Sequence, residues 1–351
     1  MKWRISLRVC FGRKLSYRIH KLILVSVAIV LLCVIIFRKN NVNPISPLLQ
    51  SKNEMHGPSL MNTTFTITHG SITKGLPKAT FQLHKGHRFN FTINNSCKWT
   101  INLLVVVCSS FANILERHAI RASWGSQDTL DSDSVLIMFL IGQQEKRRPF
   151  MQSLINKENE IYQDIIQANF VDTYYNLTMK SISLLQWASM YCKSAKYVLK
   201  VDDDVYTNIK ILLSLVATHN STEKFMMGLL RKNVDVLRNQ TRGTAQKWVL
   251  SYEEYPNKTF PLYLLGAAYL ISGPAVAGLY NATFKVPLLK LEDVYITGLC
   301  AQAAGVSRIN SSKLLFVTRR ARKLAHHAVN AFDLRPATIL RVHRLLRRIT
   351  K

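Results

Sequence analysis

Three consecutive carboxylates, Asp202, Asp203 and Asp204, follow the short and mostly apolar run 197–201. A short run rich in β-formers predicts a buried strand. Unpaired charges are costly to bury, so we expect the acids at an open end of that strand. Ligands bind at the carboxyl ends of strands in open α/β sheets, and hard oxygen ligands suit Mg²⁺ or Mn²⁺ bridging to substrate phosphates. The alternative is a solvated acidic turn, and the three acids alone do not decide between the two.

A second acidic pair, Glu292 and Asp293, stands directly before an apolar stretch with helical spacing. Acids are common at helix starts because they favour the positive end of the helix dipole, so the pair can be an ordinary start signal. Alternatively, a carboxylate aimed from a helix start into a cleft is a general base, able to accept a proton from a hydroxyl nucleophile.

Two arginines, Arg117 and Arg121, follow the first predicted strand and are four residues apart, so they share one face of a helix. Two guanidinium groups behind a strand end can hold a diphosphate. The alternative is a solvated basic face with Trp124 in the core, which the spacing alone favours.

The elements that position these residues alternate along the chain. Predicted strands lie at 103–108, 135–141, 164–166, 170–171, 197–201, 225–229 and 263–271, and predicted helices at 114–124, 149–162, 177–193, 209–217 and 274–280. Strands alternating with helices indicate an α/β fold, a mostly parallel sheet with helices on both faces.

The chain of 351 residues carries a formal net charge of +27, dense in 1–21 and 319–351. A basic balance indicates anionic partners. We expect no nucleic-acid partner, because neither a zinc finger nor an aromatic RNP run occurs. The basic pattern at 341–348 predicts a helix with either a solvated face or one that contacts anionic lipid headgroups or glycolipid acceptors.

An uncharged apolar run occupies 22–37, after seven basic residues in 1–21. It is short for a membrane span, which wants about 20 residues, and a cleaved signal peptide is the rival interpretation. We favour an uncleaved transmembrane signal anchor because Arg38 and Lys39 follow in place of a cleavage site. The excess of positive charge before the run predicts a cytoplasmic N-terminus and a type II membrane protein.

Residues 38–96 are rich in Pro, Gly, Ser, Thr and Asn, which predicts a luminal stem. The expected organisation is therefore a cytoplasmic tail at 1–21, an anchor at 22–37, a stem at 38–96 and a catalytic domain at 97–351. Nine N-glycosylation sequons, all after the anchor, support a luminal location, which is oxidising. They begin at Asn62, Asn90, Asn94, Asn176, Asn220, Asn239, Asn257, Asn281 and Asn310.

Taken together, the motifs resemble the β-1,3-glycosyltransferase family that includes the β-1,3-galactosyltransferases and β-1,3-N-acetylglucosaminyltransferases. RHAIRASWG at 117–125 is similar to that family's RxxIRxTWG, KVDDDVYTN at 200–208 to KxDDDVFxN, and EDVY at 292–295 to EDVYVG. YYNLT at 174–178 resembles a linking YxNLT stretch, and KW at 247–248 with EYP at 254–256 resembles KWYV…EYP. The order and spacing agree from about residue 103 to 309.

The resemblance implies a GT-A-type nucleotide-sugar-binding fold with a Rossmann-like sheet, a UDP-sugar donor and Mn²⁺ as cofactor. By position, Asp204 would be the main metal ligand, and Asp202 would lie near the metal or the ribose. Asp203 and Lys200 belong to the same donor-binding motif.

The resemblance also implies inverting transfer. Asp293 would be the catalytic base that takes a proton from the acceptor's 3-hydroxyl, and Glu292 is the alternative base. Arg117 and Arg121 would shape the donor site or serve only the structure.

Two features depart from the family pattern. Related enzymes have a histidine after EDVY as a further metal ligand, whereas none occurs here between His219 and His326. His326 or His327 is a candidate replacement. The family's Cys before its GxGY stretch is also absent from LLGAAY at 264–269, along with its later partner.

Among the four cysteines after the predicted anchor, we expect Cys97 to pair with Cys192. One precedes the first strand and the other ends the helix before the acidic strand, and neighbouring parallel strands would bring them close. Cys108 and Cys300 lie in apolar runs and are expected to be buried thiols, although they too can pair.

The sequence therefore predicts a Golgi type II membrane galactosyltransferase. It would transfer galactose from UDP-galactose to the 3-hydroxyl of a glycan acceptor on a glycoprotein or glycolipid. The alternatives are the same fold using UDP-N-acetylglucosamine, and a catalytically weak relative that acts as a partner or chaperone of another transferase.

Overall fold

The computed structural model describes residues 88–95, 97, 101–130, 134–146, 149–239, 246–311, 313–314, 329–331 and 333–349. All belong to the second of the chain's two units, residues 74–351. The predicted tail and anchor span lie outside the described residues, as does the predicted stem up to residue 87. Within the described part, no helix is both long enough and apolar enough to cross a bilayer.

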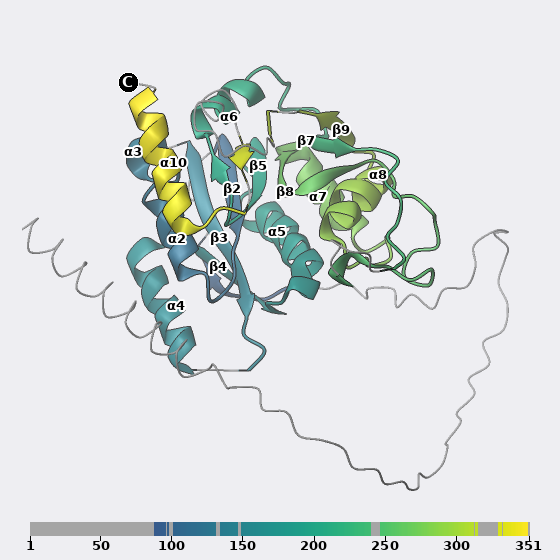
Figure 1. The fold of residues 1–351 in the computed structure, drawn as a ribbon, viewed down its shortest axis with the longest axis horizontal. Coiled ribbons are helices and arrows are strands. Elements are labelled where there is room, and N and C mark those ends of the chain that lie inside the picture. Colours follow the sequence, from purple (N-terminus) through teal and green to yellow (C-terminus); the bar gives the residue numbers. More distant parts are fainter. Residues whose placement is uncertain are drawn as a thin grey trace, which may run out of the picture. The chain divides into compact units, whose positions relative to one another are not determined.

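One eight-stranded sheet forms the centre, in the order β1-β4-β3-β2-β5-β8-β7-β9 (Figure 1). Its strands are β1 (Phe91–Asn94), β2 (Leu103–Cys108), β3 (Val135–Gln143), β4 (Ile165–Val171), β5 (Tyr197–Asp202), β7 (Phe225–Arg231), β8 (Tyr263–Ser272) and β9 (Ser307–Asn310). Every residue of β2 is buried. A continuous apolar run is what a strand covered on both faces requires.

The sheet is mixed, which corrects the mostly parallel sheet predicted from the sequence. Strands β4, β3, β2 and β5 run parallel to one another, but β8 is antiparallel to both β5 and β7, and β1 is antiparallel to β4. Among the described residues, only the 3₁₀ turn η2 (Gln246–Trp248) lies between β7 and β8. Without a crossover helix, the returning strand pairs in the antiparallel sense.

Helices cover both faces of the sheet, as predicted. One face packs against α2 (Ile114–Arg121), α3 (Gln127–Leu130), α4 (Pro149–Tyr162), α6 (Ile209–Val216) and α10 (Pro336–Ile349); the other packs against α5 (Leu177–Tyr191), α7 (Gly273–Ala282), the π-helical segment η3 (Val294–Cys300) and α8 (Ala301–Ala303). Alternate strand residues supply the two cores: Leu104 and Val106 face α5, whereas Val105 and Val107 face α2. This period of two is the ordinary geometry of a strand.

The folded part begins upstream of the boundary expected at Cys97. Strand β1 pairs with β4, and the backbone N–H of the buried Phe89 donates a hydrogen bond to Gln186 Oε1 at 2.7 Å. The sequon-rich composition around Asn90 and Asn94 conceals this strand, because alternation over four residues is a weak signal.

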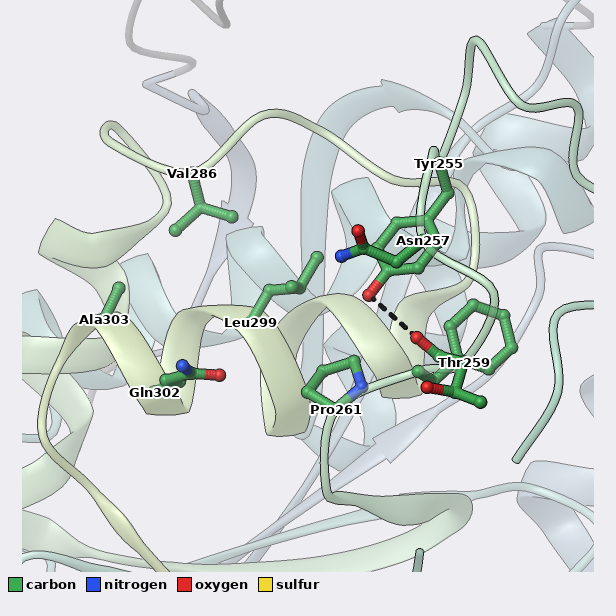
Figure 2. Close-up of a pocket in the computed structure, with 9 residues that line it drawn as sticks. Tyr255, Asn257, Thr259, Pro261, Val286, Leu299, Gln302 and Ala303 are labelled. Atoms are coloured by element: carbon green, nitrogen blue, oxygen red, sulfur yellow. Dashed lines mark hydrogen bonds between the residues drawn. The ribbon is translucent and has the colours of Figure 1, made fainter. Parts of the chain in front are cut away.

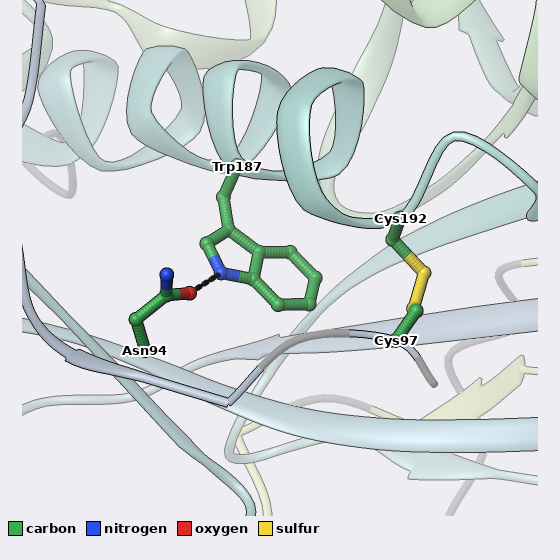
Figure 3. The surroundings of a disulfide bond; sticks show 4 residues. All are labelled: Asn94, Cys97, Trp187 and Cys192. Carbon is green, nitrogen blue, oxygen red and sulfur yellow. Dashed lines mark hydrogen bonds between the residues drawn. A yellow bond between two sulfur atoms is a disulfide. The ribbon is translucent and has the colours of Figure 1, made fainter. Parts of the chain in front are cut away.

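A disulfide joins Cys97 to Cys192, as predicted, with their Cα atoms 5.1 Å apart (Figure 3). It ties the segment before β2 to the end of α5. Beside it, Trp187 Nε1 donates a hydrogen bond to Asn94 Oδ1 at 2.8 Å, so a second contact fixes β1 against the same helix. Cys108 and Cys300 are buried free thiols, which excludes the alternative pair.

Removing this disulfide should cost about 2–5 kcal/mol of stability, because it closes a loop with a sequence separation of 95 residues. The double variant with Cys97→Ser and Cys192→Ser is therefore expected to unfold at lower denaturant concentration than the wild type. Reductant should lower the midpoint of the wild type and leave that of the double variant unchanged. A wild-type midpoint insensitive to reductant would contradict a stabilising role.

Candidate active site

The carboxyl ends of β2, β4 and β5 meet at one edge of the sheet. A buried lysine of α5, Lys180, connects the first two: its Nζ lies 2.7 Å from Asp172 Oδ1 after β4 and donates to the Ser109 carbonyl after β2 at 2.5 Å. Asp202 ends β5 on the same edge, and Asp203 and Asp204 follow it. This edge is where ligands bind in open α/β sheets, so the acids stand where the sequence predicts.

The three acids of the turn have three different settings. Asp203 is buried and accepts two hydrogen bonds on Oδ2, from Ser109 Oγ at 2.7 Å and Asn113 Nδ2 at 2.9 Å. Asp202 and Asp204 are partly exposed. Asp203 therefore anchors the turn to the end of β2, whereas its two neighbours present carboxylates towards solvent.

Negative charge is concentrated at this turn. Burial raises the pKa of Asp204 to about 6, and repulsion from Asp202 and Asp203 adds to the shift. The pKa of Asp202 is also raised, chiefly by burial, although the Lys200 ammonium opposes that shift. A cation at the turn would relieve this repulsion, because an opposite charge favours the ionised carboxylate.

Lys200 lies between the two acidic sites. Its buried Nζ donates to Asp202 Oδ1 at 2.5 Å and to the Gly266 carbonyl at 2.6 Å, and it lies 3.9 Å from Glu292 Oε2. Burial alone would lower the pKa of Lys200, but attraction to Asp202 and Glu292 outweighs it, and the pKa is raised. The lysine is thus a charged internal bridge, and its predicted part in donor binding stays a prediction.

The carboxylates of Glu292 and Asp293 have different partners: a buried side chain binds Glu292, whereas Asp293 accepts a hydrogen bond from a backbone N–H. Glu292 is buried and accepts a hydrogen bond from the Tyr269 hydroxyl at 2.6 Å. Asp293 stands at the start of η3, where its Oδ1 accepts from the Val294 N–H at 2.8 Å. Burial and repulsion from Glu292 raise the pKa of Asp293 to about 6, which suits a general base near neutral pH.

The two predicted arginines are committed to buried ion pairs. Arg117 forms a two-pronged contact with Glu158 of α4 at 2.7 and 2.8 Å, and Arg121 bonds both Glu158 at 2.7 Å and Asp164 at 2.8 Å. Sequence reasoning missed both acidic partners. Glu158 lies in the predicted helix at 149–162, but no local pattern in the sequence indicates that this acid contacts α2.

Arg117 still reaches the acidic turn indirectly. Its Nη1 donates to the Ser110 carbonyl at 2.6 Å and to Ser109 Oγ at 3.2 Å, and that hydroxyl holds Asp203. The structure therefore places Arg117 behind the turn, and the predicted shaping of the donor site by either arginine stays a prediction.

Comparison with known proteins identifies the family of this chain. The family model described as Galactosyltransferase matches residues 115–312, from α2 to just after β9. The chain belongs to the galactosyltransferase family.

Two relatives of this chain carry names that specify different sugars. UDP-GalNAc:beta-1,3-N-acetylgalactosaminyltransferase 1 of Rattus norvegicus is 37% identical over 217 residues, covering 60% of this chain and 64% of the relative. Beta-1,3-galactosyltransferase 5 of Pan troglodytes is 33% identical over 214 residues, covering 61% and 70%. The chain thus spans about two thirds of the length of these relatives. Among solved structures, S. aureus TarS 1-349 is distant, at 13% identity and a TM-score of 0.34 over 70% of this chain and 71% of that one.

The C-terminal segment lies beyond the galactosyltransferase match and yet contacts the acidic turn. Strand β10 (Val329–Ala331) pairs with β6 (Tyr206–Thr207), and the Leu334 N–H donates to the Asp204 carbonyl at 3.0 Å. The Tyr206 hydroxyl and His343 Nδ1 of α10 share a buried hydrogen bond of 2.9 Å. Sequence reasoning considered this helix only as a basic surface and missed its inner face, where Ile339 and Val342 are buried.

The described residues supply only part of the predicted set of protein ligands for a metal ion. Within the described residues, no group of three or more His, Cys, Asp or Glu side chains gathers as a metal site. His326 and His327, the candidate replacements for the family histidine, lie outside the described residues. The partly exposed carboxylates of Asp202 and Asp204 nevertheless fit Mn²⁺ or Mg²⁺, which commonly bind one or two carboxylates and complete their shell with phosphates and water.

A separate open pocket of about 720 Å³ lies beside η3 and α8 (Figure 2). Its lining is uncharged and comes mainly from two segments, with Tyr255, Asn257 and Pro261 facing Leu299 and Gln302. None of the predicted site residues lines it. The acidic edge, not this pocket, is therefore the candidate active site.

Replacing Asp204 with asparagine should stabilise the metal-free protein at high pH. The Asp204 pKa is about 6 in the folded state against a usual 3.8, so its contribution to stability is fully present below about 3.8 and lost as pH rises through about 6. We expect Asp204→Asn to melt about 2–4 °C above the wild type at pH 8 and at the same temperature at pH 4. The exposed Asp235→Asn is the control, and an equal shift at both pH values would contradict the charge-crowding explanation.

Proposed function

We propose that this protein is a β-1,3-galactosyltransferase with a GT-A-type fold, which transfers galactose from UDP-galactose to the 3-hydroxyl of a glycan acceptor with inversion. One observation carries the proposal. Lys200 bridges an acidic turn, suited to a cation that would bind a diphosphate, to Glu292, and the next residue, Asp293, has a pKa of about 6 that suits a base. Membership of the galactosyltransferase family and the ordered set of motifs support the same conclusion.

Asp293 is the proposed base. At neutral pH a carboxyl with a pKa near 6 is mostly ionised, yet it accepts a proton more readily than an ordinary aspartate. It would take the proton of the acceptor hydroxyl as that oxygen attacks the anomeric carbon and UDP leaves. Glu292 would assist as a fixed negative charge, because its own carboxylate is held by Tyr269 and Lys200.

Asp204 and Asp202 are the proposed holders of Mn²⁺. When bound, the cation would offset negative charge on the leaving diphosphate. The chain's own groups prepare the site: Asp203 fixes the turn to Ser109, and Lys200 orients the carboxylate of Asp202.

The proposed location is the Golgi membrane, with the anchor at 22–37 and the catalytic domain in the lumen. The disulfide supports an oxidising compartment. Surface exposure of sequon asparagines supports glycosylation there, because the acceptor nitrogen must be accessible. The exposed ones are Asn90, Asn94, Asn220, Asn239, Asn257, Asn281 and Asn310.

The roles of the two acids are separable by mutation of the full-length protein in detergent. Asp204→Ala should weaken binding of UDP with Mn²⁺ and lower transfer, since the cation loses its main ligand. Asp293→Asn should lower kcat by about 10²–10⁴-fold with UDP binding intact, since only the base is lost. In the wild type, kcat/KM should fall as pH drops through about 6, where Asp293 becomes protonated. Loss of UDP binding in Asp293→Asn would indicate a structural role instead.

A donor panel decides the sugar. The named relatives divide between galactose and N-acetylgalactosamine, and the motifs also resemble N-acetylglucosaminyltransferases. We expect the highest kcat/KM with UDP-galactose when UDP-galactose, UDP-N-acetylgalactosamine and UDP-N-acetylglucosamine are compared over the same acceptors. A preference for either N-acetylated donor would revise the donor. Failure to turn over any of them, with UDP still bound, would favour the catalytically weak partner.

A further inference from the structure

Two motifs of the sequence have no part in the acidic site, and the structure brings them together. YYNLT supplies the 3₁₀ turn η1 (Tyr174–Asn176), and KW lies in η2 (Gln246–Trp248). Trp248 Nε1 donates a hydrogen bond to the Tyr174 hydroxyl at 3.0 Å, although the two residues are 74 positions apart. The contact joins the end of β4 to the loop between β7 and β8.

The aromatic rings at this junction are exposed. The exposed fraction is 44% for Tyr174, 62% for Tyr175 and 43% for Trp248. Lys247 Nζ lies 3.9 Å from the centroid of the Tyr174 ring, and the rings of Tyr174 and Tyr175 meet edge to face at 6.3 Å. Contacts on Tyr174 thus hold an exposed group of large rings in place, and clustered exposed apolar surface marks interaction sites.

The aromatic group lies on the same edge of the sheet as the acidic turn. Tyr174 follows Asp172, which Lys180 ties to the end of β2. The next helix, α5, holds the segment that leads to the proposed base, since Thr178 Oγ1 donates to the Leu289 carbonyl at 2.7 Å. From the η2 side, Glu254 pairs with Lys290 at 2.9 Å. The segments that follow η1 and η2 therefore both contact the residues just before Glu292, at Leu289 and Lys290.

We propose that Tyr174, Tyr175 and Trp248 form the platform on which a neutral pyranose of the acceptor glycan stacks; this rests on the proposed function. The face of an aromatic ring carries negative charge density, and the C–H groups on the apolar face of a pyranose carry partial positive charge. Rings fixed next to the residues that bind the segment before the base can hold an acceptor sugar by that attraction, and the hydroxyl groups of the sugar stay free to react. Lys247 Nζ lies 3.9 Å from the ring centroid of Tyr174 and 5.2 Å from that of Trp248, so it covers one face of each. Tyr175 and the other face of Trp248 therefore supply the stacking faces.

The test uses the full-length protein in detergent with N-acetyllactosamine and methyl β-N-acetylglucosaminide as probes. Trp248→Ala and Tyr175→Ala should each raise the Kd and the acceptor KM for the probe that binds by about 5- to 10-fold, the range expected for one lost ring contact. The Kd for UDP with Mn²⁺ should not change. Trp248→Phe, which keeps a ring, should recover part of the loss.

Tyr252→Ala is the matched control. Tyr252 is 67% exposed and stacks on Arg238, whose guanidinium carbon lies 4.0 Å from its ring centroid, so it is an exposed aromatic ring with a partner of its own. It should leave both affinities unchanged.

Three outcomes would overturn the platform. The first is an unchanged probe Kd in both Trp248→Ala and Tyr175→Ala, and the second is a wild type that binds neither probe. The third is a parallel loss of UDP binding in the two variants, which would show that the rings support the fold and not the acceptor. Because probe binding is measured without donor, a wild type that binds the probe but not UDP with Mn²⁺ would refute the proposed function alone.

Discussion

The site depends on one buried positive charge. Lys200 lies on β5 between Asp202 at the strand's end and Glu292 before η3, so one ammonium offsets two carboxylates that face different parts of the site. Two acids brought this close without it would face the full cost of burying unpaired charge. The strand register makes the bridge possible, because Lys200 pairs with Tyr269 of β8, and the Tyr269 hydroxyl holds Glu292.

Behind that bridge, the edge is fixed by polar contacts from distant segments. Ser109 is their meeting point: its hydroxyl holds Asp203 and receives Arg117, and its carbonyl receives Lys180. Arg117 is in turn locked by Glu158. Satisfied buried networks of this kind give a unique geometry, and each member would be costly if left unpaired. Arg117 therefore helps to fix the position of Asp203 through the Ser109 hydroxyl, and Arg121 supports it by sharing Glu158.

Much of the fold follows from local patterns. The buried run Leu103–Cys108 and the helix Pro149–Tyr162 were predictable, because a strand covered on both faces is continuously apolar and an amphipathic helix repeats at 3.6 residues. The antiparallel direction of β8 was not, because direction depends on the connection and not on the strand's own residues. The motifs predicted which acids form the site, but no local pattern predicted which distant residues bind one another. The pairing of Tyr206 with His343 spans 137 positions.

Glycine at position 266 shows how closely the sheet edge and the proposed base are fitted together. A Cβ built there would lie 3.2 Å from Asp293 Cβ and 3.3 Å from Glu292 Oε2, tighter than ordinary contacts. The same residue's carbonyl accepts the Lys200 hydrogen bond. A side chain at this position would push the acidic pair away from the lysine that compensates it. The missing Cβ at this position therefore allows the close approach of the acidic pair, and no turn is involved.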